Sequence, residues 1–228
     1  MLTRLSRLGL EVKYLGPARE FYEGDLDLPV RREGEEEVVL AAGDVDLCLR
    51  RPRSVPRGGV HTHFACSIPA DEYDEWWERL GDDHELEEFR FGSARSLYCY
   101  DPDGNCVELG QRDVAGPGID GVFEVAIEVE SLDRAESFYA ALGFETVDRG
   151  DERRRVRMAG PVALELWEPQ LGIADARGGV HVDLGFEADD PGAVADAVRD
   201  AACAVERTDG GVVVRDPDGH HLTVVGAE

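Results

Sequence analysis

The sequence lacks any segment long and apolar enough to cross a membrane. No apolar run approaches the roughly 18 residues that a spanning helix needs, and the first residues contain no hydrophobic stretch typical of a signal peptide. The chain also contains no glycine-rich phosphate loop, no Ser-His-Asp order and no zinc-finger spacing. We therefore expect a soluble, cytoplasmic protein with no membrane partner.

Cysteines are few and show no pairing pattern. None is in CxxC spacing, three lie in apolar strand patterns, and the number is odd. The five are Cys48, Cys66, Cys99, Cys106 and Cys203. They are interpreted as small buried apolar side chains in a reducing compartment.

Basic residues are scarce. The chain has 24 Lys and Arg against 49 Asp and Glu, a formal net charge of -25, and Lys13 is the only lysine. Such a chain repels nucleic acids and anionic membranes, so neither is an expected partner. The acids are spread over every segment, which is typical of a haloarchaeal-type protein, because a Debye length of ~3 Å at ~1 M salt screens their repulsion. We predict a halophilic protein whose acids are mostly a solvent-facing coat.

What the chain does contain is an internal duplication. Three short motifs occur twice, in the same order and at offsets of 120, 115 and 117 residues: RGGVH at Arg57 and Arg177, DPDG at Asp101 and Asp216, and Phe-Tyr at Phe21 and Phe138. The near-constant offset indicates one unit of about half the chain, duplicated and fused.

Each half repeats again in pattern. Four runs of alternating apolar residues predict strands with one covered face, and they span Leu8–Val12, Phe64–Ile68, Val125–Val129 and Val182–Phe186. Alternation predicts that Leu8, Phe64, Val125 and Leu184 face the core. A helical pattern follows each run, and its start is marked by Pro17, Asp71, Ser131 or Asp190. Two or three short β-rich runs come next, with a tight turn predicted at each DPDG. The predicted fold class is α+β, with four βαβββ units.

Three segments resemble the vicinal oxygen chelate superfamily: RLGLEVKYLGPAREFY and EVAIEVESLDRAESFYAALGF resemble its opening, and DPDGNCVEL its closing strand. This superfamily includes glyoxalase I, bleomycin and fosfomycin resistance proteins, methylmalonyl-CoA epimerase and extradiol dioxygenases. The resemblance covers essentially the whole chain and implies two glyoxalase-like domains, 1–112 and 121–228, joined by a linker at 113–120. It implies that two units of each domain curve a mixed sheet into a cup. A divalent metal would bind there through one residue of each first strand and one of each last strand.

In the N-terminal cup, the resemblance places the ligand positions at Arg7, Cys48, His63 and Glu108. His63 and Glu108 match the commonest ligand types of the superfamily, and Cys48 would suit a soft metal such as zinc. Arg7 cannot bind a metal, because its guanidinium stays protonated, but it can pair with Glu108 and fill the metal's place. The alternative is such an Arg–Glu pair beside a satisfied histidine.

In the C-terminal cup, the positions are Glu124, Glu165, Asp183 and Thr223, with His221 on the same strand face as Thr223. Three converging carboxylates repel one another unless they are protonated or neutralised by a cation. We therefore expect Mg²⁺, Mn²⁺ or Ca²⁺ in this cup, with Zn²⁺, Ni²⁺ and Fe²⁺ less suited to it. The alternative is that these acids belong to the halophilic coat or are a residual pattern of the superfamily.

A substrate pocket is predicted from residues that share these strand faces. Trp167 lies on the face of Glu165, and Arg50 lies on the face of Cys48, where it can bind a carboxylate or phosphate group or pair with Asp46. The remaining pocket residues predicted are Arg7, Cys48, His221 and Thr223.

The resemblance implies a metal-assisted lyase, isomerase or epimerase acting on a small oxygenated metabolite. The metal would polarise a carbonyl while Glu108 or Glu165 moves a proton. Ring-cleaving dioxygenases are disfavoured, because neither predicted cup supplies two histidines and one carboxylate. The alternative is a non-catalytic binding protein of the drug-resistance type. In either case we expect a small-molecule ligand and a monomer or homodimer.

Overall fold

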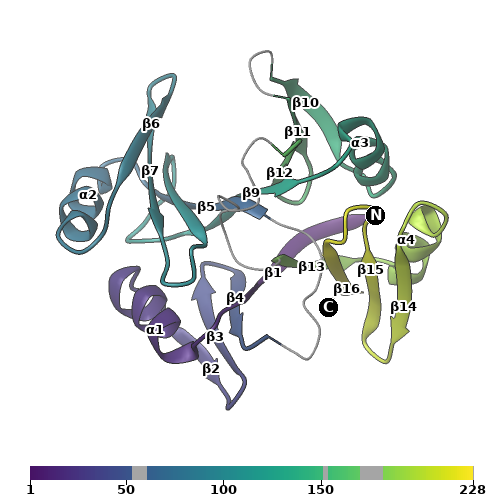
Figure 1. Ribbon diagram of the computed structural model, residues 1–228, viewed down its shortest axis with the longest axis horizontal. Helices are drawn as coiled ribbons and strands as arrows, with labels where there is room; N and C mark the ends of the chain where they lie inside the picture. The colour runs from purple at the N-terminus through teal and green to yellow at the C-terminus, as the bar shows by residue number, and fades with distance from the viewer. Residues whose placement is uncertain (53–60, 151–153, 170–181, 228) are drawn as a thin grey trace.

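The four predicted βαβββ units are present in the computed structural model, which describes residues 1–52, 61–150, 154–169 and 182–227 (Figure 1). The first unit comprises β1 (Leu2–Glu11), α1 (Leu15–Arg19), the π-helical turn η1 (Glu20–Asp25), β2 (Val30–Glu33), β3 (Glu37–Ala42) and β4 (Val45–Arg50). The second comprises β5 (His61–Pro69), α2 (Tyr73–Gly81), β6 (Glu87–Phe91), β7 (Ala94–Tyr100) and β8 (Cys106–Arg112). The third comprises β9 (Gly121–Glu128), α3 (Leu132–Ala141), β10 (Glu145–Arg149), β11 (Arg155–Ala159) and β12 (Ala163–Trp167). The fourth comprises β13 (Val182–Ala188), α4 (Pro191–Val198), β14 (Ala204–Thr208), β15 (Gly211–Arg215) and β16 (His221–Gly226).

The strands form two eight-stranded mixed sheets, and each sheet combines two units. Sheet A has the order β14-β15-β16-β13-β1-β4-β3-β2, and sheet B has the order β10-β11-β12-β9-β5-β8-β7-β6. In both sheets the first strands of the two units lie at the centre and pair antiparallel, β1 with β13 and β5 with β9. Each sheet therefore has the curled arrangement predicted for a glyoxalase-like domain. No helix in the part of the chain that the structure describes is long and apolar enough to cross a bilayer.

The predicted pairing of the units is wrong. We expected the first unit to share a sheet with the second, and the third with the fourth. Sheet A instead joins the first and fourth units, and sheet B joins the second and third. Segment 113–120 therefore connects β8 to β9 within sheet B. The sequence did not reveal this because all four first strands carry the same alternating pattern, so the edge of β1 suits β5 and β13 equally.

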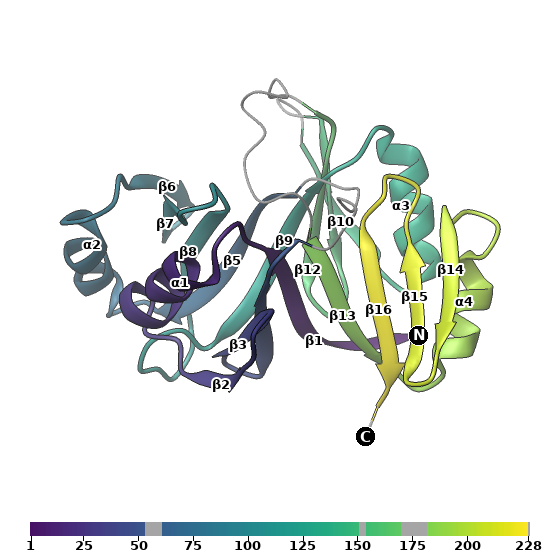
Figure 2. The same cartoon turned by 60° about the horizontal axis from the view of Figure 1, so that its bottom comes forward.

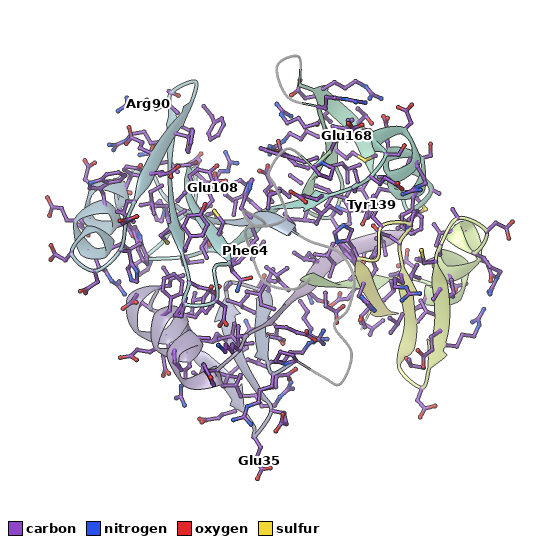
Figure 3. All side chains as sticks on the ribbon, in the orientation of Figure 1. Glu35, Phe64, Arg90, Glu108, Tyr139 and Glu168 are labelled. Atoms are coloured by element: carbon purple, nitrogen blue, oxygen red, sulfur yellow. The ribbon has the colours of Figure 1, made fainter. Side chains whose placement is uncertain are left out.

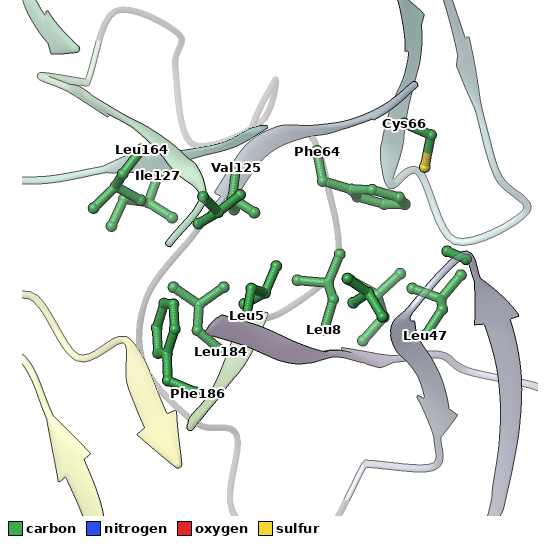
Figure 4. Close-up of a cluster of buried hydrophobic side chains, with 14 of the residues drawn as sticks. Leu5, Leu8, Leu47, Phe64, Cys66, Val125, Ile127, Leu164, Leu184 and Phe186 are labelled. Atoms are coloured by element: carbon green, nitrogen blue, oxygen red, sulfur yellow. The ribbon is translucent and has the colours of Figure 1, made fainter. Parts of the chain in front are cut away.

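The two sheets pack against each other through the apolar faces of their central strands. Leu8, Phe64, Val125 and Leu184, which alternation predicted to face the core, are fully buried. Figure 4 shows side chains of β1 and β13 meeting those of β5 and β9, and residues of both sheets form one continuous apolar cluster. Because strand side chains alternate, the polar residues of these strands face away from the shared core. The two concave faces, called cup A and cup B after their sheets, open away from each other (Figures 1 and 2).

Local sequence signals place two of the helices. The side chain of Ser131 accepts a hydrogen bond from the backbone N–H of Arg134 at the start of α3. Asp190 does the same for Ala193 at the start of α4, where Pro191 occupies the first turn. Both starts agree with the predicted capping pattern. Four of the five cysteines are buried, as predicted, whereas Cys203 is exposed.

Each DPDG turn is tied to the tyrosine of a Phe-Tyr motif. The hydroxyl of Tyr22 donates to Asp101 Oδ2 at 2.9 Å, and that of Tyr139 donates to Asp216 Oδ2 at 2.8 Å. The other carboxylate oxygen of each aspartate accepts backbone N–H groups of its own turn. Tyr22 belongs to a unit of sheet A and Asp101 to a turn of sheet B, whereas Tyr139 belongs to a unit of sheet B and Asp216 to a turn of sheet A. The repeated motifs therefore fasten sheet A to sheet B in both halves of the chain.

We expect Tyr139→Phe to lower the free energy of unfolding by about 1–3 kcal/mol, because it removes the donor to a buried carboxylate oxygen. Guanidinium titration in multimolar KCl measures this change. Tyr14→Phe is the matched control, since the Tyr14 side chain is exposed and its loss of a hydroxyl should change stability by less than about 0.5 kcal/mol. Equal stabilities of the two variants would show that the Tyr139–Asp216 contact does not fasten the sheets.

Candidate metal centre

Cup B brings together one histidine and three glutamates from its four innermost strands. His63 comes from β5, Glu108 from β8, Glu124 from β9 and Glu165 from β12. All four are buried, although the chain is rich in exposed acids. They alternate with core residues such as Phe64 and Val125, so they face the concave side of sheet B. In Figure 3, Glu108 lies on this concave side, and Phe64 lies on the side toward sheet A. These acids therefore do not belong to a solvent-facing coat.

The ligand atoms of this cluster are close together. Nε2 of His63 lies 3.4 Å from Oε2 of Glu108 and 3.5 Å from Oε1 of Glu124. One ligand atom of each of these three residues falls within 4.8 Å of the other two. Glu165 lies just beyond this group and is linked to it by Arg157, whose Nη1 is 3.0 Å from Glu165 Oε1 and also pairs with Glu124 Oε2.

Neighbouring side chains hold the carboxylates in place. The hydroxyl of Tyr98 donates to Glu108 Oε2 at 2.7 Å, and the indole N–H of Trp167 donates to Glu165 Oε2 at 2.9 Å. The rings of Tyr98 and Trp167 also stand edge-on to the imidazole of His63, with centroids 5.6 and 6.2 Å away. The cluster is thus walled by aromatic side chains whose polar ends orient its acids.

The charges of the cluster shift the pKa values of its members. Burial alone would lower the pKa of His63, but the carboxylates of Glu124 and Glu108 outweigh burial and raise it. Burial alone would raise the pKa of Glu124, but His63 and Arg157 reverse this and lower it. Burial and the charge of Glu108 raise the pKa of Tyr98, so its hydroxyl remains a donor. The cluster therefore strongly favours positive charge at its centre.

These residues fit a divalent metal ion. Nε2 of His63 is buried without a hydrogen bond of good geometry, while Nδ1 lies 3.1 Å from the hydroxyl of Thr62, which orients the ring. A ring nitrogen that faces two carboxylates needs a proton or a metal ion between them. One imidazole nitrogen with carboxylate oxygens is a common ligand set for divalent metals. Among the described residues, this is the one group of His, Cys, Asp and Glu with such spacing.

Cup A has the same topology but different chemistry. Its equivalent positions are Arg7, Cys48, Asp183 and Thr223, of which Asp183 is the one acid. Nε of Arg7 lies 3.1 Å from Cys48 Sγ, while Asp183 is bonded by Arg50 and Thr223, both at 3.2 Å. Arg7 stands here at the position equivalent to His63, and Cys48 and Thr223 stand at the positions equivalent to Glu108 and Glu165. A cavity of about 520 Å³ opens in this cup and is lined in part by Arg7, Arg50, Asp183 and Thr223.

The predicted ligand sets combined residues of two different cups, because the units pair differently from the prediction. Glu124 and Glu165 lie in cup B, whereas Asp183, which was predicted with them, lies in cup A. Arg7 does not pair with Glu108; its charged neighbour is Glu37, at 3.8 Å. The predicted pocket is divided in the same way. Trp167 lies beside Glu165 as predicted, and the others belong to sheet A: Arg7, Cys48, Arg50, His221 and Thr223.

Three residues around the cluster were not predicted from the sequence: Tyr98, Arg157 and Thr62. Tyr98 lies directly opposite Glu108 on β7, and Arg157 lies directly opposite Glu165 on β11. Both alternate with buried residues of their own strands, so strand alternation could have placed them on the concave face. They were missed because they contact the ligand positions through strand pairing and lie several residues away from them in the sequence. The side chains of His61 and His181, which end the two RGGVH motifs, lie outside the described part of the structure.

Comparisons with known proteins agree with this fold. No protein-family model matches the chain. A putative dioxygenase from Bacillus subtilis superposes with a TM-score of 0.75 at 15% identity, covering 99% of this chain and 85% of that one. Glyoxalase I from Zea mays superposes with a TM-score of 0.71 at 20% identity, covering 98% and 92%. In sequence, the metallothiol transferase FosB of Staphylococcus saprophyticus is 27% identical over 116 residues, 48% of this chain and 77% of that protein. These likenesses establish a fold of two glyoxalase-like domains and support the resemblance to the vicinal oxygen chelate superfamily.

Proposed function

We propose that cup B is the active site of a divalent-metal-assisted lyase, isomerase or epimerase that acts on a small oxygenated metabolite. The observation that carries this proposal is the convergence of His63, Glu108 and Glu124 on one point, with Glu165 beside them. The described residues of cup A offer no comparable set, so we expect one metal ion per chain. The resemblance in fold to glyoxalase I supports the reaction class, and the sequence likeness to a metallothiol transferase supports metal dependence.

The ligand set suggests which metal to test first. We expected Mg²⁺, Mn²⁺ or Ca²⁺ on the assumption of an all-oxygen site in the C-terminal half. Cup B adds one imidazole nitrogen, which suits Mn²⁺ better than Ca²⁺ and also accommodates Ni²⁺ or Zn²⁺. Mn²⁺ is therefore the proposed probe.

The residues of cup B have distinct roles in this proposal. A bound divalent metal supplies Lewis-acid polarisation of a substrate carbonyl. Glu108 accepts the proton from the carbon beside that carbonyl and returns it to the neighbouring carbon; in an epimerisation, water donates a proton to the opposite face instead. Tyr98 fixes the Glu108 carboxylate through its 2.7 Å hydrogen bond. Glu165 is the less suited base, because it lies outside the group formed by His63, Glu108 and Glu124 and because Trp167 donates to its Oε2.

The proposed function is tested by isotope exchange. α-Hydroxy ketones and the hemithioacetals formed by methylglyoxal with small thiols are incubated in D₂O with Mn²⁺-loaded protein, and deuterium incorporation is followed by mass spectrometry. We expect incorporation with the wild type and with Asp183→Asn, and none with Glu108→Gln. Protein that holds Mn²⁺ but exchanges no substrate proton would contradict this reaction class.

A second candidate function is sequestration of a small molecule without chemistry. The cavity in cup A favours it, because its charged lining can bind a polar ligand without a metal. The two functions make opposite predictions in the exchange experiment, since a sequestering protein would leave the substrate undeuterated.

We also expect no cleavage of catechols. Cup B has one histidine and three carboxylates, whereas non-haem iron oxygenases of this kind use two histidines and one carboxylate. Protein reconstituted anaerobically with Fe²⁺ and then exposed to oxygen should leave a catechol panel unchanged. A yellow ring-fission product would refute the assignment of this ligand set.

A further inference from the structure

Arg157 occupies a position that can be compared with three others in the same chain. Each last-strand ligand position has one residue directly opposite it on the neighbouring strand that lies nearer the edge of the sheet. That residue is Tyr98 opposite Glu108, Arg157 opposite Glu165, Val39 opposite Cys48 and Val213 opposite Thr223. Both residues of cup A are valines. The fold therefore does not require a polar residue at this position, although cup B has one in both of its units.

The guanidinium of Arg157 binds the carboxylates that a metal would use. Nη1 donates to Glu165 Oε1 at 3.0 Å and also pairs with Glu124 Oε2. Glu124 and Glu165 have nearly fully buried side chains, whereas the Arg157 side chain is 30% exposed. The arginine thus reaches into the cup from its solvent side and can leave without unpacking the core.

The charges of cup B make the Arg157 contacts and metal binding mutually exclusive. Glu108, Glu124 and Glu165 bring three negative charges into a buried site, where Arg157 pairs with Glu124 and Glu165 and Arg155 pairs with Glu165. A divalent cation bound to Glu124 and Glu165 supplies positive charge at the place that the Arg157 guanidinium occupies. Once it binds these carboxylates, a guanidinium held beside it adds like-charge repulsion at short distance.

We propose that Arg157 competes with the divalent metal for Glu124 and Glu165, and that metal binding turns its guanidinium toward the opening of cup B, where it binds an anionic group of the substrate. Arg157 is thus a specificity-determining residue for substrates that carry a carboxylate. The second part rests on the proposed function, and the first part does not. A planar guanidinium suits this second role, because it can bind a carboxylate through two parallel hydrogen bonds.

The first part is tested by calorimetric titration of Mn²⁺ into wild type, Arg157→Met, Arg157→Lys and Arg154→Met. Arg157→Met should bind Mn²⁺ about two- to fivefold more tightly, which is the weight of one partly exposed ion pair. Arg157→Lys retains the competing charge and should stay near the wild type. Arg154→Met is the matched control, because Arg154 is largely exposed and pairs with Glu168 rather than with a cluster residue. Unchanged or weaker Mn²⁺ binding by folded Arg157→Met would overturn the competition.

The second part is tested by steady-state kinetics on a carboxylate-bearing substrate and its uncharged methyl ester. Arg157→Met should raise KM for the carboxylate about tenfold, the weight of one charge-assisted hydrogen bond, and leave KM for the ester unchanged. An equal effect on both substrates would refute the specificity role. If no substrate is turned over, the proposed function fails, while the Mn²⁺ titration still decides the competition.

Discussion

Glu108→Gln should weaken Mn²⁺ binding by at least about 100-fold, because even the loss of an outer-shell partner of a metal ligand costs about 10- to 100-fold. The substitution removes a negative charge and a ligand oxygen from the group that also contains His63 and Glu124. Calorimetry on chelator-treated protein in multimolar KCl measures the change. We expect one Mn²⁺ per wild-type chain.

Asp183→Asn is the matched control for this prediction. Asp183 occupies the equivalent ligand position in cup A and is as buried as Glu108, but it is bonded by Arg50 and Thr223. We expect its substitution to leave Mn²⁺ binding within about twofold of the wild type, since sites without shared partners behave additively. If Asp183→Asn abolishes binding and Glu108→Gln does not, the metal centre lies in cup A.

The thermal midpoint of unfolding should rise by more than about 10 °C between 0.1 and 3 M KCl, which corresponds to several kcal/mol at about 2–4 °C per kcal/mol for a chain of this size. The reason is the net charge of -25, whose self-repulsion salt screens. Calorimetric scans of chelator-treated protein measure the midpoint. Sorbitol at matched osmolality is the control, because it changes water activity without screening charge. A midpoint that stays flat or falls with KCl would refute the halophilic hypothesis.

Most of the fold follows from local patterns in the sequence. Alternation placed Leu8, Phe64, Val125 and Leu184 in the core, and all four are fully buried. Capping residues marked the starts of α3 and α4. Such signals act over a few residues and survive in any arrangement of the units. The pairing of units is different, because it depends on which of several equivalent strand edges meet.

In the candidate metal centre, too, local signals could be predicted and the pairing of units could not. His63, Glu108, Glu124 and Glu165 were each identified singly, because alternation and the family resemblance fix the strand face and the position along it. Their assembly into one cup could not be predicted while the first unit was assumed to pair with the second. Arg157 was missed for a related reason. Its role depends on a strand register that brings it opposite Glu165, not on any motif in its own segment.

The most direct test of the metal centre is an anomalous difference map from crystals grown with Mn²⁺, recorded at the manganese edge. We expect one strong peak per chain in cup B, within bonding distance of His63 Nε2 and of oxygens from Glu108, Glu124 and Glu165. The same map should show the Arg157 guanidinium no longer in contact with Glu124. A peak in cup A, or none in cup B under saturating Mn²⁺, would contradict the proposed metal centre.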